Sequence, residues 1–286
     1  MTFDYYNVWT CVQGASEDHL NWLEKALSYT RKARRGETSD SLLLRHASPP
    51  MFPSGWLLPV LDQAKRSGVS IVVNDKRKRP FHPDFSQDTS WLYPYQVEAV
   101  HKLLTADRGL LKAATSSGKG EVIASVFKML PGRCFLLLRD ASLLIQLAER
   151  ISKRLGEPVG VIGADRWEGT KNRIVVATSQ SINSYWHQPT GSTTGVWHNE
   201  VRGLLASFDV VAEDEVHGSA CAQNQRVLQS MHNAFYRYGF SATVDGRSDK
   251  RDAYVLAQFG PIAHVSTDME MEQAGRTAEC EIVMVE

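Results

Sequence analysis

Residues 109–124 read "GLLKAATSSGKGEVIA", and the order of residue types in this stretch decides the fold. An apolar run is followed by small residues, by Gly118-Lys119, and then by apolar side chains at helical spacing. This order predicts a strand, a flexible loop and a helix. Backbone N–H groups at such a helix start cradle phosphate, and Lys119 adds a positive charge. The alternative is an ordinary strand–turn–helix corner, and the context favours the phosphate loop.

Strands and helices alternate on both sides of this loop. Apolar strands are predicted at 109–113, 134–138, 173–178, 208–213 and 238–242. Helices are predicted around 95–105, 119–130, 141–155 and 222–234, and a long polar loop at 187–200. Apolar strands separated by helices predict an α/β fold, in which helices cover both faces of a parallel sheet. Ligands of such sheets bind at the carboxyl ends of the strands.

A small α+β domain is expected over residues 1–83. Its predicted elements are helices at about 17–34 and 55–67 and a strand at 69–73. The next residues, 84–92, continue a proline-containing stretch with little periodicity, so we expect a linker there. The larger domain is then expected to span 93–286.

Composition is that of a globular protein, with 43% hydrophobic and 22% charged residues and no long apolar run or secretion signal. Four scattered cysteines without a CxxC pair favour a reducing, cytoplasmic location. Net charge is zero, but basic clusters stand at 31–35 ("RKARR") and 76–79 ("KRKR"). Such clusters are usually solvated surface, and contact with nucleic acid is the alternative.

A second motif, "FDVVAEDEVHG" at 208–218, places acidic residues at the end of an apolar strand. Carboxylates are costly at the mouth of a buried strand unless a ligand needs them. A magnesium nucleotide needs two, and we assign Asp214 to hold the metal and Glu215 to orient and deprotonate the attacking water. The phosphate loop upstream favours this catalytic interpretation over a solvated acidic loop.

Six motifs in order over residues 91–245 resemble those of superfamily-two helicases and DNA translocases. They are "YPYQVEAV" (93–100, Q motif), "ATSSGKG" (114–120, motif I), "RDASLLIQLAERI" (139–151, Ia), "ATSQSI" (177–182, Ib), "DEVH" (214–217, II) and "SAT" (241–243, III). The resemblance implies the first RecA-like motor domain of that family, with ATP and Mg²⁺ as cofactors.

The resemblance also implies roles for individual residues. Catalysis is expected from Lys119, Asp214, Glu215 and His217, with Asp214 also the metal ligand. Nucleotide binding is expected from Gln96, which would read the adenine edge, and from Thr115, Ser116, Ser117, Gly118, Lys119, Gly120 and Glu121. Nucleic-acid contact is expected from Arg139, Thr178, Ser179 and Gln180. The coupling between nucleotide state and nucleic-acid binding is expected to run through Ser241, Ala242 and Thr243.

Two further segments narrow the resemblance. Residues 238–267 and 52–75 are similar to the segment after motif III and to the small preceding domain in the phage UvsW and XPB-like branch. This similarity implies ATP-driven translocation on single-stranded or branched DNA, branch migration, and unwinding of recombination, repair or fork intermediates. It also implies a bacterial cytoplasm or a phage-infected host.

The sequence departs from the family at Gly120, where a hydroxyl residue normally helps to hold magnesium. We therefore expect weakened magnesium dependence and slower hydrolysis, with nucleotide binding retained. Nothing after Thr243 resembles the motifs of the second RecA-like domain, which supplies the arginine finger in the family. That domain is expected from a further C-terminal region or from a partner chain. The alternatives are a non-motor adaptor or inhibitor that binds nucleotide and nucleic acid, and an RNA helicase fragment.

Overall fold

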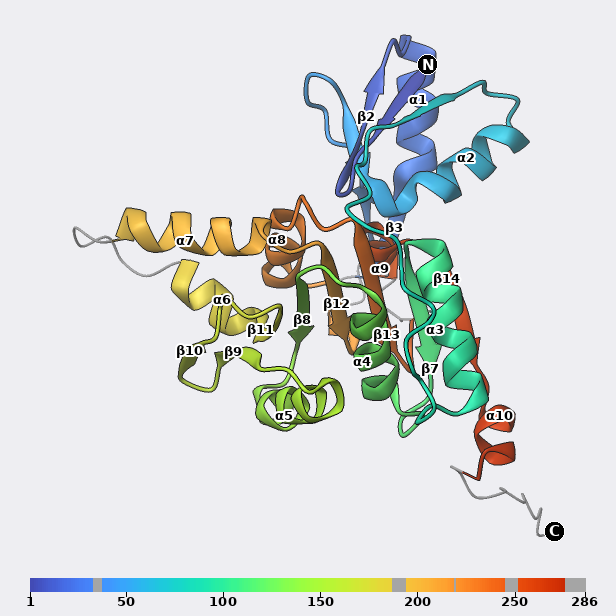
Figure 1. Cartoon of the computed structure of the whole chain (residues 1–286). Helices are drawn as coiled ribbons and strands as arrows, with labels where there is room; N and C mark the ends of the chain where they lie inside the picture. Colours follow the sequence, from blue (N-terminus) through green and yellow to red (C-terminus); the bar gives the residue numbers. More distant parts are fainter. Residues whose placement is uncertain (33–37, 187–193, 219, 245–251, 276–286) are drawn as a thin grey trace, which may run out of the picture.

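The computed structural model describes residues 1–32, 38–186, 194–218, 220–244 and 252–275 (Figure 1). A small sheet with two helices, formed by the first 75 residues, lies at one end of a larger α/β domain (Figure 1). The irregular segment between β6 and α3 runs along the larger domain, where Phe81 stacks on Tyr236. The domain boundaries drawn from the sequence stay a prediction.

The larger domain is built on a sheet of eight strands in the order β10-β9-β11-β8-β12-β13-β7-β14. The strands are β7 (Arg108–Ala113), β8 (Cys134–Leu138), β9 (Val159–Gly163), β10 (Arg166–Glu168), β11 (Ile174–Thr178), β12 (Val210–Asp214), β13 (Tyr236–Ser241) and β14 (Ile262–Ser266). All neighbouring pairs are parallel except β10 with β9. The predicted α/β fold class is confirmed.

Helices cover both faces of this sheet. They are α3 (Pro94–Ala106), α4 (Lys119–Met129), α5 (Leu144–Leu155), α6 (Ser179–Trp186), α7 (Thr194–Ala206), α8 (Ala222–Ser230), α9 (Asp252–Phe259) and α10 (Asp268–Gln273). The strand β8 shows why two cores form: Leu136 packs with the core under α3, α4 and α5, whereas Phe135 and Leu137 pack with the core under α6 to α9. Successive side chains of a strand point to opposite faces, so an uninterrupted apolar strand requires cover on both.

The small domain contains a second sheet, in the order β5-β2-β1-β6, which is mainly antiparallel. Its elements are β1 (Thr2–Tyr5), β2 (Trp9–Gln13), α1 (Glu17–Leu27), β5 (Met51–Pro53), α2 (Leu57–Arg66) and β6 (Val72–Asp75). A separate hairpin joins β3 (Ser28–Lys32) to β4 (Thr38–Leu42). In the basic cluster at 31–35, residues 33–35 lie outside the described residues, so the structure does not address that cluster.

Several sequence expectations were wrong in detail. The helix expected at 17–34 ends at Leu27, because Ser28 is extended and begins a strand paired with β4. The polar segment at 187–200 was expected to be a loop, but α7 begins at Thr194; residues 187–193 lie outside the described residues. Strands β1, β2, β3, β4, β5, β9, β10 and β14 were not anticipated, since each has only three to five residues.

The small domain packs closely on the larger one. Arg108, at the start of β7, donates to the Tyr5 hydroxyl (3.2 Å) and to the Asn7 carbonyl (3.3 Å). Trp56 donates from Nε1 to the carbonyl of Ala253 in α9 (2.9 Å). Gly55 lies directly against α9, and a side chain on it would meet backbone atoms there. The junction therefore requires a glycine for close approach, not for an unusual backbone angle.

We expect Gly55→Ala to lower the free energy of unfolding by roughly 1–3 kcal/mol, as overpacking does in a close-packed interior. A Cβ on Gly55 would lie 2.0 Å from the Leu256 carbonyl oxygen and 2.7 Å from that of Ala257, and backbone cannot yield as a side chain can. Urea unfolding measures the change. The matched control is Gly203→Ala in α7, where a Cβ meets nothing within 4 Å. Equal stability of the two variants would contradict this account of the junction.

Candidate active site

The sequence motifs meet at the carboxyl edge of the large sheet. The loop at 114–118 follows β7, Arg139 follows β8, and Ser179 follows β11. Asp214 ends β12 and Ser241 ends β13. Because parallel strands all end at the same edge, residues more than a hundred positions apart in the chain become neighbours here.

The phosphate loop makes the predicted transition from strand to helix. Gly118 caps α4 in the left-handed conformation (φ +79°), and a Cβ on it would lie 2.3 Å from the Gln96 side-chain nitrogen. A glycine is therefore required at this position both by backbone angle and by space. The buried hydroxyl of Ser117 has no hydrogen-bond partner among the described residues.

Two side chains at the start of α3 donate hydrogen bonds to the backbone of this loop. The Tyr95 hydroxyl and the Gln96 amide nitrogen each donate to the Ser117 carbonyl, both at 2.8 Å. The Gln96 amide oxygen accepts from the Tyr93 backbone (3.0 Å), and Gln96 is only 2% exposed. Both polar ends of Gln96 are thus engaged with the protein, so reading an adenine edge would require exchanging these bonds.

Lys119 connects the loop to the acidic motif. Its ammonium group lies 3.3 Å from Glu215 Oε1 and 3.4 Å from the carbonyl oxygens of Ala113 and Ala114. Its side chain is 9% exposed, whereas that of Glu215 is 34% exposed. Lys119 is thus shielded from solvent, whereas Glu215 is partly open to it. A charged ligand that enters from solvent can therefore reach this ion pair.

Asp214 lies next to this pair, in a position that disfavours the charged form of its carboxyl group. Burial away from water, together with the neighbouring Glu215 carboxylate, raises the pKa of Asp214 to about 6. Lys119 and the Glu215 backbone N–H, which donates to Asp214 Oδ1 at 3.0 Å, act in the opposite direction. Glu215 itself has a positive φ of 56°, an uncommon backbone state for a non-glycine residue and one that clusters at functional sites.

A hydrogen-bonded network extends from Glu215 to the next strand. The buried Ser241 hydroxyl donates to Glu215 Oε2 at 3.2 Å, and His217 Nδ1 lies 3.2 Å from the same oxygen. His217 Nδ1 is also 3.3 Å from the Ser241 hydroxyl, which accepts from the Thr243 backbone (3.3 Å). The structure therefore joins the residues of "DEVH" to those of "SAT" directly.

The candidate nucleic-acid residues divide into two groups. Arg139 and Gln180 are exposed and border a hollow of about 580 Å³ shared with Asp214, Glu215 and His217. Thr178 and Ser179 are buried, at 2% and 8% exposure, and the Thr178 hydroxyl donates to Ser181 instead. Only the first two residues present side chains to a ligand in this arrangement.

Other side chains act in ways that sequence motifs did not indicate. Asn224 in α8 donates to the fully buried Glu213 carboxylate at 2.5 Å, so this acid is part of the core. Glu121 accepts from Arg154 (2.8 Å) and so points toward α5 rather than toward a phosphate. Lys128 and Arg154 both pack over the ring of Trp91. Tyr95 stands in the quoted Q-motif stretch, but no spacing rule marks its hydroxyl as a partner of the loop.

The described residues contain no cluster of three or more His, Cys, Asp and Glu side chains that could enclose a metal ion. A single carboxylate facing a phosphate loop is nevertheless sufficient for Mg²⁺, which keeps several waters and shares substrate phosphate oxygens. The raised pKa of Asp214 marks a carboxylate whose charge the protein compensates only in part, and the Ser117 hydroxyl has no partner among the described residues. The donor set thus fits a magnesium ion that arrives with a nucleotide.

Comparisons with known proteins show what this chain is similar to. A family model described as "Type III restriction enzyme, res subunit" matches residues 90–246. The DNA 3'-5' translocase XPB2 of Sulfurisphaera tokodaii is 25% identical over 178 residues, or 62% of this chain and 36% of the relative. The chain thus spans about a third of that relative's length.

Solved structures of UvsW helicase from bacteriophage T4 share the fold. One matches with a TM-score of 0.69 and 15% identity, covering 93% of this chain and 99% of that chain. Another has a TM-score of 0.67 and 17% identity, covering 91% of this chain and 56% of that chain. Each match covers more residues than the large domain contains. It therefore includes residues of the small domain as well.

The parallel sheet, the phosphate loop after β7 and the carboxylate pair after β12 define a RecA-like motor domain of the superfamily-two helicases and translocases. Within that class, the chain belongs to the family described by the res subunit of type III restriction enzymes. Among the helices that the structure describes, none has the length and apolar character needed to cross a bilayer.

We expect Asp214→Asn to stabilise the nucleotide-free protein near pH 7.5, where the wild-type carboxylate is charged. The folded state of the wild type holds the Asp214 proton more tightly than the unfolded state, whose pKa is near the ordinary 3.8. Wild-type stability therefore falls as pH rises from about 4 to about 6, and the full penalty applies above that range. The difference between the folded and unfolded pKa values of Asp214 corresponds to about 2–3 kcal/mol in the free energy of unfolding.

Urea unfolding of both proteins, without metal or nucleotide, measures the prediction as a difference at each pH. The advantage of Asp214→Asn should grow between about pH 4 and pH 6 and vanish below about pH 4, because both side chains are then neutral. An advantage that stays constant from acid to neutral pH would contradict a raised pKa at Asp214.

Proposed function

We propose that this protein is the ATP-hydrolysing motor domain of a DNA translocase or helicase that acts on branched, recombination or fork DNA. The observation that carries the proposal is the 3.3 Å contact between Lys119 and Glu215, which joins the phosphate loop to the acidic motif across the carboxyl edge of the sheet. A lysine at a helix start and an adjacent carboxylate are the two groups that phosphoryl transfer to water uses.

Each of three residues then has one task. Lys119 leaves Glu215 and the loop carbonyls to hold the terminal phosphate of ATP, assisted by backbone N–H groups at the start of α4. Asp214 would hold the magnesium ion, which neutralises phosphate charge when bound. Glu215, released from Lys119, orients the attacking water and accepts its proton. The loss of the Lys119–Glu215 contact on nucleotide binding is thus what frees the base.

The Ser241 hydroxyl would communicate this change to the nucleic-acid side. It donates to Glu215, and His217 Nδ1 lies 3.2 Å from the same carboxylate oxygen, so any movement of Glu215 toward a water alters both contacts. Arg139 and Gln180 border the same hollow as Glu215 and His217, and we assign them contacts to the DNA backbone. Thr178 and Ser179 would act by positioning the start of α6, since their side chains are buried.

The choice of DNA as substrate rests on the relatives, whose names describe a DNA 3'-5' translocase and the T4 UvsW helicase. We further propose that a second RecA-like domain completes the site, in the same polypeptide or in a partner. Arginine fingers supply roughly 10³- to 10⁵-fold in rate in related reactions. Hydrolysis by the 286-residue chain alone should then be slow, and equilibrium nucleotide binding is the more direct measurement.

We expect Lys119→Ala to weaken ATP binding roughly tenfold to a hundredfold, since it removes a charge-assisted contact to phosphate. Glu215→Gln should retain binding but lower turnover about 10²- to 10⁴-fold, because it removes the general base. Isothermal titration with ATP and ADP, and phosphate release with DNA, measure the two effects.

Lys102→Ala, which removes an exposed lysine of α3, is the matched control and should bind nucleotide as the wild type does. A wild-type protein that binds neither ATP nor ADP at millimolar concentration would overturn the proposal. Wild-type turnover in Glu215→Gln would remove Glu215 from its assigned role, whereas nucleotide binding without any phosphate release in the presence of DNA would favour a non-motor adaptor.

We expect Gly120→Thr to strengthen the magnesium dependence of ATP binding, because it restores a hydroxyl at the start of α4. The Cβ would lie 3.3 Å from Leu147 Cδ1 and 3.6 Å from an Arg150 nitrogen, so Leu147 must move by a few tenths of an ångström. Gly120→Val is the matched control, since it has the same shape without the hydroxyl. Titration with ATP at several magnesium concentrations separates them, and identical behaviour of both variants would show that the site holds its metal without this group.

A further inference from the structure

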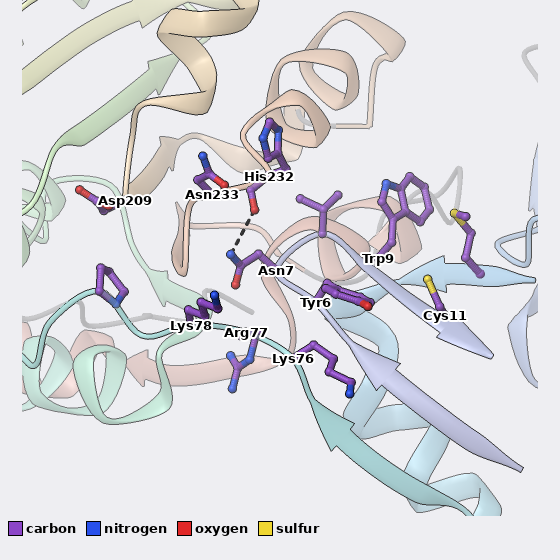
Figure 2. Close-up of a pocket in the computed structure, with 13 residues that line it drawn as sticks. Tyr6, Asn7, Trp9, Cys11, Lys76, Arg77, Lys78, Asp209, His232 and Asn233 are labelled. Atoms are coloured by element: carbon purple, nitrogen blue, oxygen red, sulfur yellow. Dashed lines mark hydrogen bonds between the residues drawn. The ribbon is translucent and has the colours of Figure 1, made fainter. Parts of the chain in front are cut away.

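A second hollow lies at the junction of the small domain and the large one (Figure 2). It has a volume of about 640 Å³ and is bordered on one side by the turn between β1 and β2. On the other side are Asp209, which precedes β12, and Asn233, which precedes β13. Asp214 and Ser241 stand at the far ends of these two strands, so the hollow and the candidate active site lie at opposite edges of the sheet.

The surface of this hollow offers aromatic rings. Tyr6, at the tip of the β1–β2 turn, is 44% exposed, and its ring has no aromatic or cationic partner among the described residues. Trp9 borders the same space and carries the Arg45 guanidinium over its ring at 4.0 Å. Figure 2 shows Tyr6 in the turn between β1 and β2 and Trp9 at the start of β2. The exposed Tyr6 ring at a concave site is suited to stacking on a flat ligand.

The basic segment "KRKR" at 76–79 separates into two kinds of residue at this hollow. Arg77 pairs with Asp75 (2.8 Å) and stacks on Tyr5, and Arg79 pairs with Asp107 (2.7 Å). These two arginines hold the segment against the protein. Lys76 and Lys78 alternate with them, are exposed, border the hollow, and have no carboxylate partner in the described part of the chain.

Lys76 and Lys78 therefore present two unpaired positive charges that the fold does not use. The acidic side chain at this site, Asp209, is already engaged, since its Oδ2 accepts from the Arg133 backbone at 2.9 Å. The hollow thus combines an aromatic side with a cationic border, where Lys76 and Lys78 outweigh the single negative charge of Asp209.

A further unsatisfied group lies between these two sides. Asn7 donates from its amide nitrogen to the His232 carbonyl at 3.1 Å (Figure 2), which fixes the direction of its side chain. The Asn7 amide oxygen then has no donor among the described residues. An unpaired buried acceptor costs free energy, so this turn is less stable than full hydrogen bonding would make it.

We propose that this hollow binds a segment of single-stranded DNA, with a base stacked on Tyr6 and phosphates held by Lys76 and Lys78. Stacking on an aromatic platform beside a cationic track is how proteins hold single strands without reading their sequence. The proposal rests on the proposed function for its choice of DNA, and it adds a second contact at the opposite edge of the sheet. A branched DNA has more than one arm, and two separated contacts can hold two of them.

The test uses fluorescence anisotropy of a labelled, mixed-sequence single strand of about twelve nucleotides, within the site sizes known for such grooves. It is carried out on the 286-residue chain without nucleotide, and in the Arg139→Ala/Gln180→Ala background, which removes the other assigned DNA contact. Tyr6→Ala should weaken binding roughly fivefold or more, and Tyr6→Phe should not, because the ring is kept.

The lysine pair is tested through salt dependence. Lys76→Ala/Lys78→Ala should lower the slope of log affinity against log salt by about 1.4, which is the effect of losing two phosphate contacts to a single strand. Lys25→Ala/Lys65→Ala is the matched control, because it removes the same charge from exposed positions elsewhere on the small domain. Thermal melts verify that each variant is folded, and Tyr6 lies on an exposed turn where truncation leaves the core intact.

The outcomes separate this inference from the proposed function. Unchanged affinity in Tyr6→Ala and an unchanged salt slope in the Lys76→Ala/Lys78→Ala variant, with binding lost in Arg139→Ala/Gln180→Ala, overturn the second site and leave the proposed function standing. An equal effect of the Lys25/Lys65 control would reduce the result to bulk charge and also overturn the site. A wild-type chain that binds no DNA at all overturns both.

Discussion

The carboxylate pair at the end of β12 is the constraint on which this site depends. Asp214 and Glu215 repel each other in a partly buried position, and the raised pKa of Asp214 is the direct sign of that cost. Lys119 is the cation that lies against Glu215, and it comes from the helix after β7. The sheet order β12-β13-β7 sets the separation of these groups and places Ser241, at the end of the strand between them, in contact with Glu215.

The opposite edge of the same sheet is organised around arginine. Arg237, at the start of β13, is buried and donates to the carbonyls of Leu228, Met231 and Gln258, near the ends of α8 and α9. Burial, with the neighbouring Arg108, lowers the pKa of Arg237 to about 9. Arg108 donates to the same Gln258 carbonyl and to the small domain. The small domain is thereby tied to the same backbone group that holds β13 in place.

Much of the fold could be predicted because its central strands are apolar on both faces. The expected strands at 109–113, 134–138 and 173–178 agree with β7, β8 and β11 to within one residue at each end. Strand β14 escaped prediction because most of its residues are exposed or half-buried. The end of α1 escaped because the pairing of β3 with β4, a contact between distant residues, overrides local helical preference. Strands depend on partners that a local pattern does not contain.

Residue types and their spacing determined by themselves that this chain has a glycine–lysine loop between a strand and a helix, an acidic strand end and a sheet that brings them to one edge. Side-chain direction was decided only by the tertiary structure. The amide of Gln96 is used to hold the loop, and Thr178 and Ser179 are buried. Arg77 and Arg79 are paired, while the lysines beside them have no carboxylate partner among the described residues. The physical reason is that a motif specifies which groups are present, whereas burial and the available partners, both set by packing between distant segments, decide which of them remain open to a ligand.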